Sequence, residues 1–146
     1  MTRYKVVPDF TSEHPVGSKE WQRDYQRARR KTVTGRMATA RSNLQAQHGM
    51  SFERYEELYE KQRGCCAICT KGIARAYTAE SSGKRGPKKG GACVDHDHGC
   101  CASQRSCGRC VRGLLCHTCN IGVAAFRDKP DLMRAAIEYI TRWRWK

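Results

Sequence analysis

The sequence predicts one small domain that is stabilised by bound zinc, with basic helices before it and an amphipathic helix after it. The chain has only 146 residues, and ten of them are cysteines. Two cysteine pairs have the two-residue gap that zinc sites use. Helical patterns separated by glycine and proline flank these pairs. A core of this size needs such a metal site for stability.

The first helical region lies near the N-terminus and is basic. Ser18 is a good N-cap residue for a region that ends near His48, and aromatic residues follow it at helical spacing. Gly35 is expected to break the region into two helices. Residues 1–50 contain ten Lys or Arg residues against four Asp or Glu residues. We therefore expect a basic helical arm over residues 1–50.

Two further helices are predicted from apolar spacing. One covers residues 51–63 and ends at Gly64. The last helix is amphipathic and is expected to begin near Asp128, a good N-cap residue. Trp143 and Trp145 follow it and are expected to pack against the core, with stacking on nucleic-acid bases as the alternative.

The charge of the chain predicts a polyanionic partner. There are 28 Lys and Arg residues against 14 Asp and Glu residues, a net charge of +14. Such a field attracts nucleic acid first and a membrane surface second. The stretch SSGKRGPKKGG, residues 81–91, has the composition of a flexible basic loop that DNA could order. On the N-terminal arm, the residues expected to contact phosphates are Arg27, Arg30 and Lys31, a merely solvated charged face being the alternative.

The sequence predicts a cytoplasmic protein without a membrane partner. No segment has an apolar run long enough to cross a bilayer, and the start MTRYKVVPDF has no apolar run of the kind a signal peptide needs. In a reducing compartment, cysteines persist as thiols or metal ligands rather than disulfides.

The clearest metal signal is formed by two cysteine pairs. Cys66 and Cys69 lie in CAIC, and Cys116 and Cys119 lie in CHTC. Four thiolates fill the tetrahedral shell of zinc and leave no position for water, so this zinc is expected to be structural. Redox-active dithiols are the alternative. Any catalysis would need a different centre.

A second cysteine cluster follows in CCASQRSCGRC. Its members are Cys100, Cys101, Cys107 and Cys110. They are consistent with a second, compact zinc site, with a disulfide-closed hairpin tip or with free thiols, and the sequence leaves all three open. Two other cysteines, Cys65 and Cys93, are expected to act as small apolar residues.

An acid–histidine cluster lies between the two zinc pairs, in CVDHDHG. It contains Asp95, His96 and His98, and Asn120 directly follows the last zinc cysteine. Carboxylate and amide oxygens suit a hard divalent ion such as magnesium, and an imidazole can take a proton from water near neutral pH. This combination suits phosphodiester cleavage. A hydrated turn with two surface histidines is the alternative.

These motifs resemble a known nuclease family. CAIC, CVDHDHG, VRGLLCHTCN and AAFRDKPDLMRAAIEYI stand in the order found in the recombination endonuclease VII family, over about residues 51–142. That family belongs to the HNH or ββα-metal (His-Me finger) nucleases, many of them encoded by bacteriophages. The resemblance implies a small α+β fold with a zinc-stapled ββα-metal core and a nuclease domain over residues 51–146.

The resemblance also implies a role for each residue of the cluster. Asp95 and Asn120 would bind a catalytic Mg²⁺ or Mn²⁺ ion, and His96 would be the general base. His98 would orient phosphate or metal beside them. Arg112 would contact a phosphate, or would instead pair with an acid on the hairpin.

The function expected from the sequence is metal-dependent cleavage of DNA in a bacterial or phage-infected cell. Products would carry a 5′ phosphate, and a homodimer would allow both strands of duplex or branched DNA to be cut. Val123 stands where junction-resolving members carry a carboxylate, which favours cutting of duplex over junction resolution. The alternatives are a zinc-bound nucleic-acid-binding accessory module without catalysis, a junction resolvase, and a homing or restriction-type nuclease.

Overall fold

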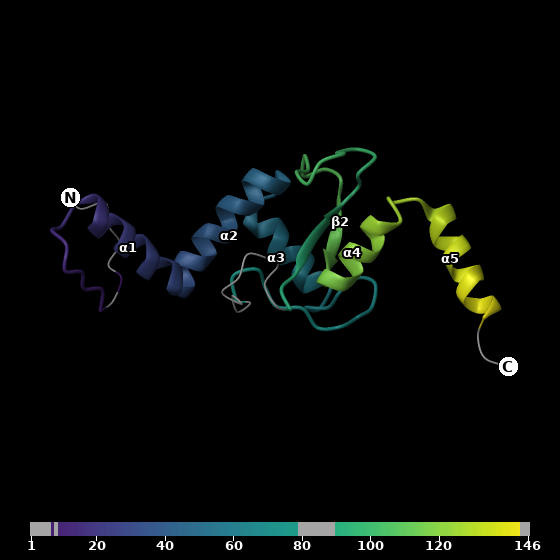
Figure 1. Cartoon of the computed structure of the whole chain (residues 1–146), viewed down its shortest axis with the longest axis horizontal. Helices are drawn as coiled ribbons and strands as arrows, with labels where there is room; N and C mark the ends of the chain where they lie inside the picture. Colours follow the sequence, from purple (N-terminus) through teal and green to yellow (C-terminus); the bar gives the residue numbers. More distant parts are fainter. Residues whose placement is uncertain (1–6, 8, 79–89, 144–146) are drawn as a thin grey trace.

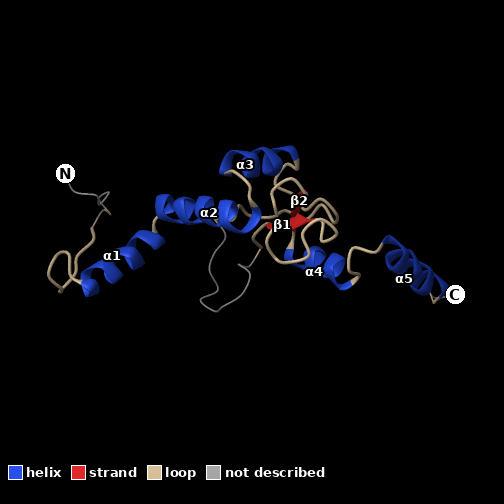
Figure 2. Cartoon of the chain, turned by 90° about the horizontal axis from the view of Figure 1, so that it is seen from above, coloured by secondary structure: helices blue, strands red, loops and turns tan. Residues whose placement is uncertain are grey.

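The computed structural model describes residue 7 and residues 9–78 and 90–143. These residues form a small α+β fold with five helices and one two-stranded antiparallel sheet. The helices are α1 (Lys19–Lys31), α2 (Val33–His48), α3 (Phe52–Lys61), α4 (His117–Ala125) and α5 (Pro130–Arg142), and the strands are β1 (Cys93–His96) and β2 (Val111–Leu115). Helices α1 and α5 lie at opposite ends, with α3, the sheet and α4 between them (Figures 1 and 2).

The basic N-terminal region forms two helices, but the break lies at Thr32 rather than at Gly35. The Thr32 hydroxyl accepts a hydrogen bond of 3.0 Å from the Gly35 N–H and so caps α2. Gly35 matters for a different reason. A Cβ atom at this position would lie 1.9 Å from the carbonyl oxygen of Arg29, so only glycine allows α2 to start this close to the end of α1.

Helix α1 carries a small aromatic cluster of its own. The Trp21 and Tyr25 rings stack with centroids 5.3 Å apart, and Phe10 meets both rings edge-on. Tyr25 is buried in this cluster. The apolar stripe that spacing predicts on this basic helix therefore packs against the segment that precedes it.

The hydrophobic core lies where α2 and α3 meet the sheet. Tyr55, Met50 and Leu114 are its most deeply buried members. The complete buried cluster contains Ala40, Leu44, Met50, Phe52, Tyr55, Cys66, Ile73, Leu114 and Leu115. Because two of these residues come from α2, that helix is part of the same core as α3.

Helix α3 agrees closely with its predicted bounds. The Ser51 hydroxyl accepts a hydrogen bond from the Arg54 N–H and caps the first turn. Gly64 follows the last turn with a φ of +65°, in the left-handed region that ends helices. The phenol groups of α3 then fix the next segment, because Tyr59 donates to the Ile73 carbonyl and Tyr55 accepts from the Ala76 N–H.

The predicted flexible basic loop, residues 81–91, is mainly outside the described residues, which resume at Gly90. The chain on either side of it is fixed by a bridge between Ala74 and Gly91. Arg75, just before the loop, pairs with Glu56 at 2.8 Å and with Glu60.

The sheet contains a bulge at the position that matters most for the site. Asp95 is opposite Gly113 and His96 is opposite Val111, so Arg112 is the extra residue on β2. Successive residues of a regular strand point to opposite faces. With the bulge between them, Asp95 and His96 are both buried, at 8% and 5% exposure.

The outer edge of β2 is closed by a side chain instead of a third strand. The Gln62 amide donates to the Leu114 carbonyl at 2.8 Å and accepts from the Leu114 N–H at 2.9 Å. A two-stranded sheet is marginal alone, and this contact ties it to the end of α3.

Helix α5 differs from its prediction at both ends. It begins at Pro130 with Lys129 as the capping residue, so the prediction that Asp128 is the N-cap is wrong. Trp143 is 72% exposed, and its predicted packing against the core is wrong as well; Trp145 lies outside the described residues. The large exposed apolar side chains of α5 are Leu132, Ile137, Tyr139 and Ile140. Of the helices described, none combines the length and the apolarity that crossing a bilayer demands.

Candidate active site and metal centres

The first cysteine tetrad, Cys66, Cys69, Cys116 and Cys119, is assembled as predicted. Its four sulfur atoms lie within 4.8 Å of one another, and the Sγ atoms of Cys69 and Cys116 are 3.7 Å apart. A tetrahedron with Zn–S bonds of about 2.3 Å has sulfur atoms about 3.8 Å apart. This tetrad could therefore hold zinc.

The backbone around the first tetrad favours the thiolate form that binds metal. Burial raises the pKa of the Cys66 thiol, but backbone N–H groups of Cys69, Cys116 and Ile68 outweigh this effect and lower the pKa to about 6. Cys116 also caps α4, because its sulfur accepts a hydrogen bond from the Cys119 N–H. The tetrad thereby fixes the start of α4 beside β2.

The second cysteine tetrad, Cys100, Cys101, Cys107 and Cys110, is assembled in the loop between β1 and β2. Its sulfur atoms also lie within 4.8 Å of one another, and all ten cysteines of the chain are free thiols. Of the three alternatives that the sequence leaves open, the structure therefore shows no disulfide here, and the tetrad could hold a metal ion.

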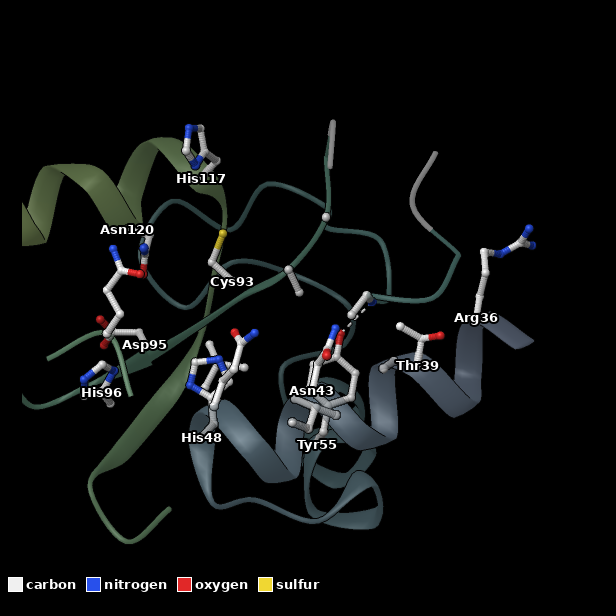
Figure 3. A pocket seen from close by; sticks show the side chains of 18 of the residues that line it. Arg36, Thr39, Asn43, His48, Tyr55, Cys93, Asp95, His96, His117 and Asn120 are labelled. Carbon is white, nitrogen blue, oxygen red and sulfur yellow. Dashed lines mark hydrogen bonds between the residues drawn. The ribbon is translucent and has the colours of Figure 1, made fainter. Parts of the chain in front are cut away.

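A pocket of about 1140 Å³ lies between α2, β1 and α4. Asp95 and His96 enter it from β1, and Asn120 enters it from α4. Figure 3 shows these three side chains gathered at one end of the pocket, with Arg36 at the other. The residues that the sequence singles out for catalysis, far apart in the chain, thus line one cavity.

The buried imidazole of His96 has one fixed nitrogen. Its Nε2 atom lies 3.0 Å from the carbonyl oxygen of Ser103. A carbonyl oxygen can only accept, so Nε2 carries the hydrogen and donates it. The lone pair of the neutral ring is then on Nδ1, which is the atom available to take a proton.

Asp95 is held by Arg112 in a two-pronged ion pair. The guanidinium donates to the two carboxylate oxygens at 2.7 and 3.0 Å, and to Asp128 at 2.9 Å. These contacts, led by the hydrogen bond to Asp95, raise the pKa of Arg112. Of the two roles that the sequence suggests for Arg112, the structure shows the pairing with a hairpin acid.

His98 lies beside His96 and is held by Asp128. The two imidazole rings have centroids 4.6 Å apart, and His98 Nδ1 is 2.7 Å from the Asp128 carboxylate. Burial alone would raise the pKa of Asp128, but hydrogen bonds from Arg112 and His98 lower it to about 2. Asp128 is therefore a site residue that sequence reasoning assigned to a helix cap.

His48 is a second residue that sequence reasoning missed. It lines the pocket from the end of α2, with its ring centroid 6.4 Å from that of His96. Burial, and then repulsion from His96, lower the pKa of His48. Within residues 9–78 and 90–143, its buried Nδ1 has no hydrogen-bond partner. A single histidine at the end of a polar helix carries no sequence signal for such a position.

The arm residues predicted to contact DNA all lie on α1, near the end that meets α2. Arg30 is among the residues that line the pocket. Arg27 is highly exposed and 3.8 Å from Asp24, and Lys31 is exposed at the end of the helix. All three residues are therefore exposed, and one of them, Arg30, also lines the pocket.

Comparison with known protein families identifies the family of this chain. A family model described as recombination endonuclease VII matches residues 41–142. The chain belongs to the recombination endonuclease VII family. The match begins inside α2 and ends with α5, so it includes both cysteine tetrads and the whole acid–histidine cluster of this endonuclease VII relative.

Two phage proteins are similar to this chain over part of their own length. The Gene 59 protein of Mycobacterium phage D29 is 31% identical over 102 residues, which are 69% of this chain and 49% of that protein. The Gene 59 protein of Mycobacterium phage L5 is 32% identical over 111 residues, which are 73% of this chain and 54% of that protein. The chain thus spans about half the length of these curated relatives. No solved structure matches it.

Val123, where the sequence resemblance implies a carboxylate in junction-resolving members, lies on α4. Its side chain is partly buried and packs against the hydrophobic core. A carboxylate at this position would lie against apolar side chains and would be costly to bury.

Proposed function

We propose that this member of the endonuclease VII family is a metal-dependent DNA endonuclease. The observation that carries the proposal is that Asp95, His96 and Asn120 line one pocket. The first cysteine tetrad supports it, because α4 delivers Asn120 directly after the last cysteine of that tetrad. A sulfur site for structure and an oxygen site for catalysis then lie on the same short helix.

The proposed catalytic unit consists of β1, β2 and α4. We propose that these three elements form the ββα-metal (His-Me finger) core of an HNH-type nuclease within a domain of residues 51–146. Residues 1–50 then form a basic arm that contacts DNA, with Arg30 and Arg36 among the residues that line the pocket. The supporting observation is the antiparallel β1–β2 pair that is followed at once by α4.

The donor atoms fit two different metal ions. Four thiols in the first tetrad suit zinc, whereas the carboxylate of Asp95 and the amide oxygen of Asn120 suit Mg²⁺ or Mn²⁺. When bound by Asp95 and Asn120, the divalent ion would stabilise the negative charge that develops on the scissile phosphate. Each carboxylate oxygen of Asp95 can accept more than one contact, so Arg112 and an ion can share it.

His96 is the proposed general base. With Nε2–H donated to Ser103, its Nδ1 lone pair takes a proton from the water that attacks phosphorus. The bond to the leaving 3′ oxygen breaks as the water oxygen bonds to phosphorus, and the 3′ oxygen takes a proton from a second water molecule, which gives a 5′ phosphate and a 3′ hydroxyl.

Two neighbouring side chains are proposed to orient the reactants. His98 is fixed by Asp128 beside His96 and would position a phosphate oxygen. Arg112 holds the Asp95 carboxylate in place from the bulge of β2 and would approach the phosphate with the rest of its exposed guanidinium. The pairing is two-pronged, so the carboxylate cannot rotate freely.

Duplex or branched DNA is the proposed substrate, in the cytoplasm of a bacterial or phage-infected cell. A net charge of +14 predicts tight binding to the DNA backbone, without sequence choice and weakening steeply as salt is added. A homodimer would place one site on each strand.

The test is cleavage of supercoiled plasmid by the zinc-loaded chain in the presence of Mg²⁺ or Mn²⁺. Wild type should nick the plasmid, and His96→Ala should lower the rate at least about 100-fold while binding DNA as before. His14→Ala is the matched control, because His14 lies on the segment before α1, and it should cleave like wild type. Equal traces of cleavage by wild type and His96→Ala would indicate contamination and support a binding module without catalysis.

A further inference from the structure

We propose that the second cysteine tetrad binds a zinc ion of its own and that this ion positions His96. The claim that the tetrad binds zinc depends on the cysteines alone. The claim that the ion positions His96 rests on the proposed function, in which His96 is the general base.

The sulfur geometry of the second tetrad matches a tetrahedral zinc site. Its Sγ–Sγ distances are 3.9 Å between Cys100 and Cys107 and 3.7 Å between Cys107 and Cys110. Zn–S bonds of about 2.3 Å require sulfur atoms about 3.8 Å apart. The Cys69–Cys116 distance in the first tetrad is 3.7 Å, so the two tetrads have the same spacing.

The backbone of the second tetrad also matches that of the first. Cys107 and Cys110 are separated by two residues, and Gly108 between them has a φ of +82°. Backbone N–H groups of Cys110 and Arg109 donate to the Cys107 sulfur. Cys66 receives the corresponding hydrogen bonds in the first tetrad. In both loops the backbone therefore holds a cysteine sulfur in place.

Few contacts other than the tetrad define the shape of this loop. Between Cys101 and Cys107 the sequence is Ala-Ser-Gln-Arg-Ser, and all of these residues except Ser106 are exposed. Ser106 is held by hydrogen bonds to the carbonyls of Gln47 and His48, and Ser103 by the one from His96. No apolar side chain of this segment belongs to the core or packs against it. Zinc bound at both ends would remove most of the conformational freedom of the segment.

Both sides of the tetrad are anchored to the rest of the protein. At its start, the Cys100 and Cys101 N–H groups donate to the Asp97 carbonyl. At its end, Arg54 donates to the Gly108 carbonyl, and a Cβ on Gly108 would lie 2.2 Å from the Gly49 carbonyl oxygen. The ion would thus join β1 to the α2–α3 corner.

Ser103 connects the second tetrad to His96, the proposed base. This residue lies two positions after Cys101 and four before Cys107, and its carbonyl accepts the His96 Nε2–H. An ion that closes the tetrad therefore fixes the acceptor that keeps the hydrogen on Nε2 and the lone pair on Nδ1. Without the ion, Ser103 would move with its exposed segment and both tautomers of His96 would be populated.

The first experiment counts zinc in the full-length protein by elemental analysis. We expect two zinc ions per chain in wild type, and one in the double variant Cys107→Ser/Cys110→Ser. The matched control Cys65→Ser/Cys93→Ser removes two cysteines outside both tetrads and should keep two. One zinc ion per wild-type chain overturns the proposal, whether or not the double variant folds.

The second experiment reads the tautomer of His96 by ¹⁵N NMR without DNA, at a pH where the ring is neutral. Wild type should show the Nε2–H form, and Cys107→Ser/Cys110→Ser should show a mixture of both forms. Cys100→His, which replaces one zinc ligand by another, should retain two zinc ions and the wild-type tautomer. If the double variant folds, has lost its second zinc ion and still shows the wild-type tautomer, the claim that the ion positions His96 is overturned. If the double variant does not fold, the same comparison is made with Cys100→Ala.

These measurements distinguish a wrong second zinc site from a wrong nuclease proposal. Metal content and tautomer are measured without DNA, so they do not depend on cleavage. A wild-type chain with two zinc ions that never cleaves DNA would contradict the nuclease proposal alone. A chain with one zinc ion that cleaves DNA would contradict the second zinc site alone.

Discussion

Arg112 has a central position among the charged side chains of the pocket. It bridges two carboxylates with adjacent negative charges, the buried Asp95 on β1 and the partly buried Asp128 after α4. His98 shares Asp128 with it. Removal of Arg112 would therefore leave two acids close together with only one imidazole to compensate them.

Replacement of Arg112 tests this arrangement. Arg112→Ala should lower the free energy of unfolding by about 1–3 kcal/mol, because it leaves the carboxylate of Asp95 buried without its partner. Urea denaturation of the zinc-loaded protein measures this change. Arg134→Ala is the matched control, since Arg134 pairs with Asp131 on the exposed face of α5 and should change stability by less than about 0.5 kcal/mol. Equal losses in the two variants would contradict the bridging role.

His48 provides a prediction on pH dependence. Burial is the larger cause of its lowered pKa and His96 the smaller, so His48 should titrate below its ordinary value of 6.5. The folded state favours the neutral ring. The contribution of His48 to the free energy of unfolding is therefore complete above pH 6.5 and is lost as the pH falls through the lower pKa of the folded state. NMR titration should show this low midpoint in wild type, and a partial rise towards 6.5 in His96→Ala. A wild-type midpoint at or above 6.5 would disprove the assignment.

For single residues, the sequence predicts those that belong to a motif. It does not predict residues that join the site only because the fold places them there. The cysteines of both tetrads and the cluster of Asp95, His96 and Asn120 stand out by type and spacing. His48 and Asp128 have no such pattern and become visible only when α2 and the end of α4 meet β1. The prediction for Asp128 failed because aspartate before a helix is usually a cap, whereas here Arg112 and His98 compete successfully for its carboxylate.

At the scale of elements, two junctions determine how the site is built. The bulge in the sheet places Arg112 against Asp95, and the first tetrad places the start of α4 beside the sheet. Sequence spacing predicts the helices well, since propensity and caps are local properties. It cannot predict the bulge, because the register of a strand depends on its partner.

The junction of α1 and α2 can be tested with a pair of glycines. Gly35→Ala would place a Cβ 1.9 Å from the Arg29 carbonyl oxygen and should separate the two helices. Amide hydrogen exchange in α1 should then become at least about tenfold faster, equivalent to about 1.4 kcal/mol of local stability. In Gly122→Ala the new Cβ meets nothing within 4 Å, and this change within α4 should stabilise by about 0.5–1 kcal/mol and leave exchange in α1 unaltered. Similar exchange rates in α1 for both variants would show that the close approach of Gly35 to the Arg29 carbonyl does not hold the two helices together.

At the scale of the whole molecule, the chain is a small core with a basic arm at one end and an exposed amphipathic helix at the other (Figure 1). The pocket lies where the arm meets the core, because Arg30 and Arg36 line it together with β1 and α4. A positively charged approach to an acid–histidine cluster is what cleavage of a polyanion requires. Overall charge predicts this partner from sequence, but only the fold brings the arm to the site.

We propose that Asn120 binds the catalytic ion and that His96 is the base. The rate of plasmid nicking as a function of Mg²⁺ concentration, measured with enzyme in excess over DNA, tests these two roles most directly. Loss of an oxygen ligand in Asn120→Ala should shift the curve at least about tenfold towards higher Mg²⁺. Loss of the base in His96→Ala should lower the maximal rate at saturating Mg²⁺ without that shift. We therefore expect Asn120→Ala to change the Mg²⁺ dependence and His96→Ala to change the maximal rate. A wild-type rate for His96→Ala at saturating Mg²⁺, or no nicking by wild type at any Mg²⁺ concentration, would contradict it.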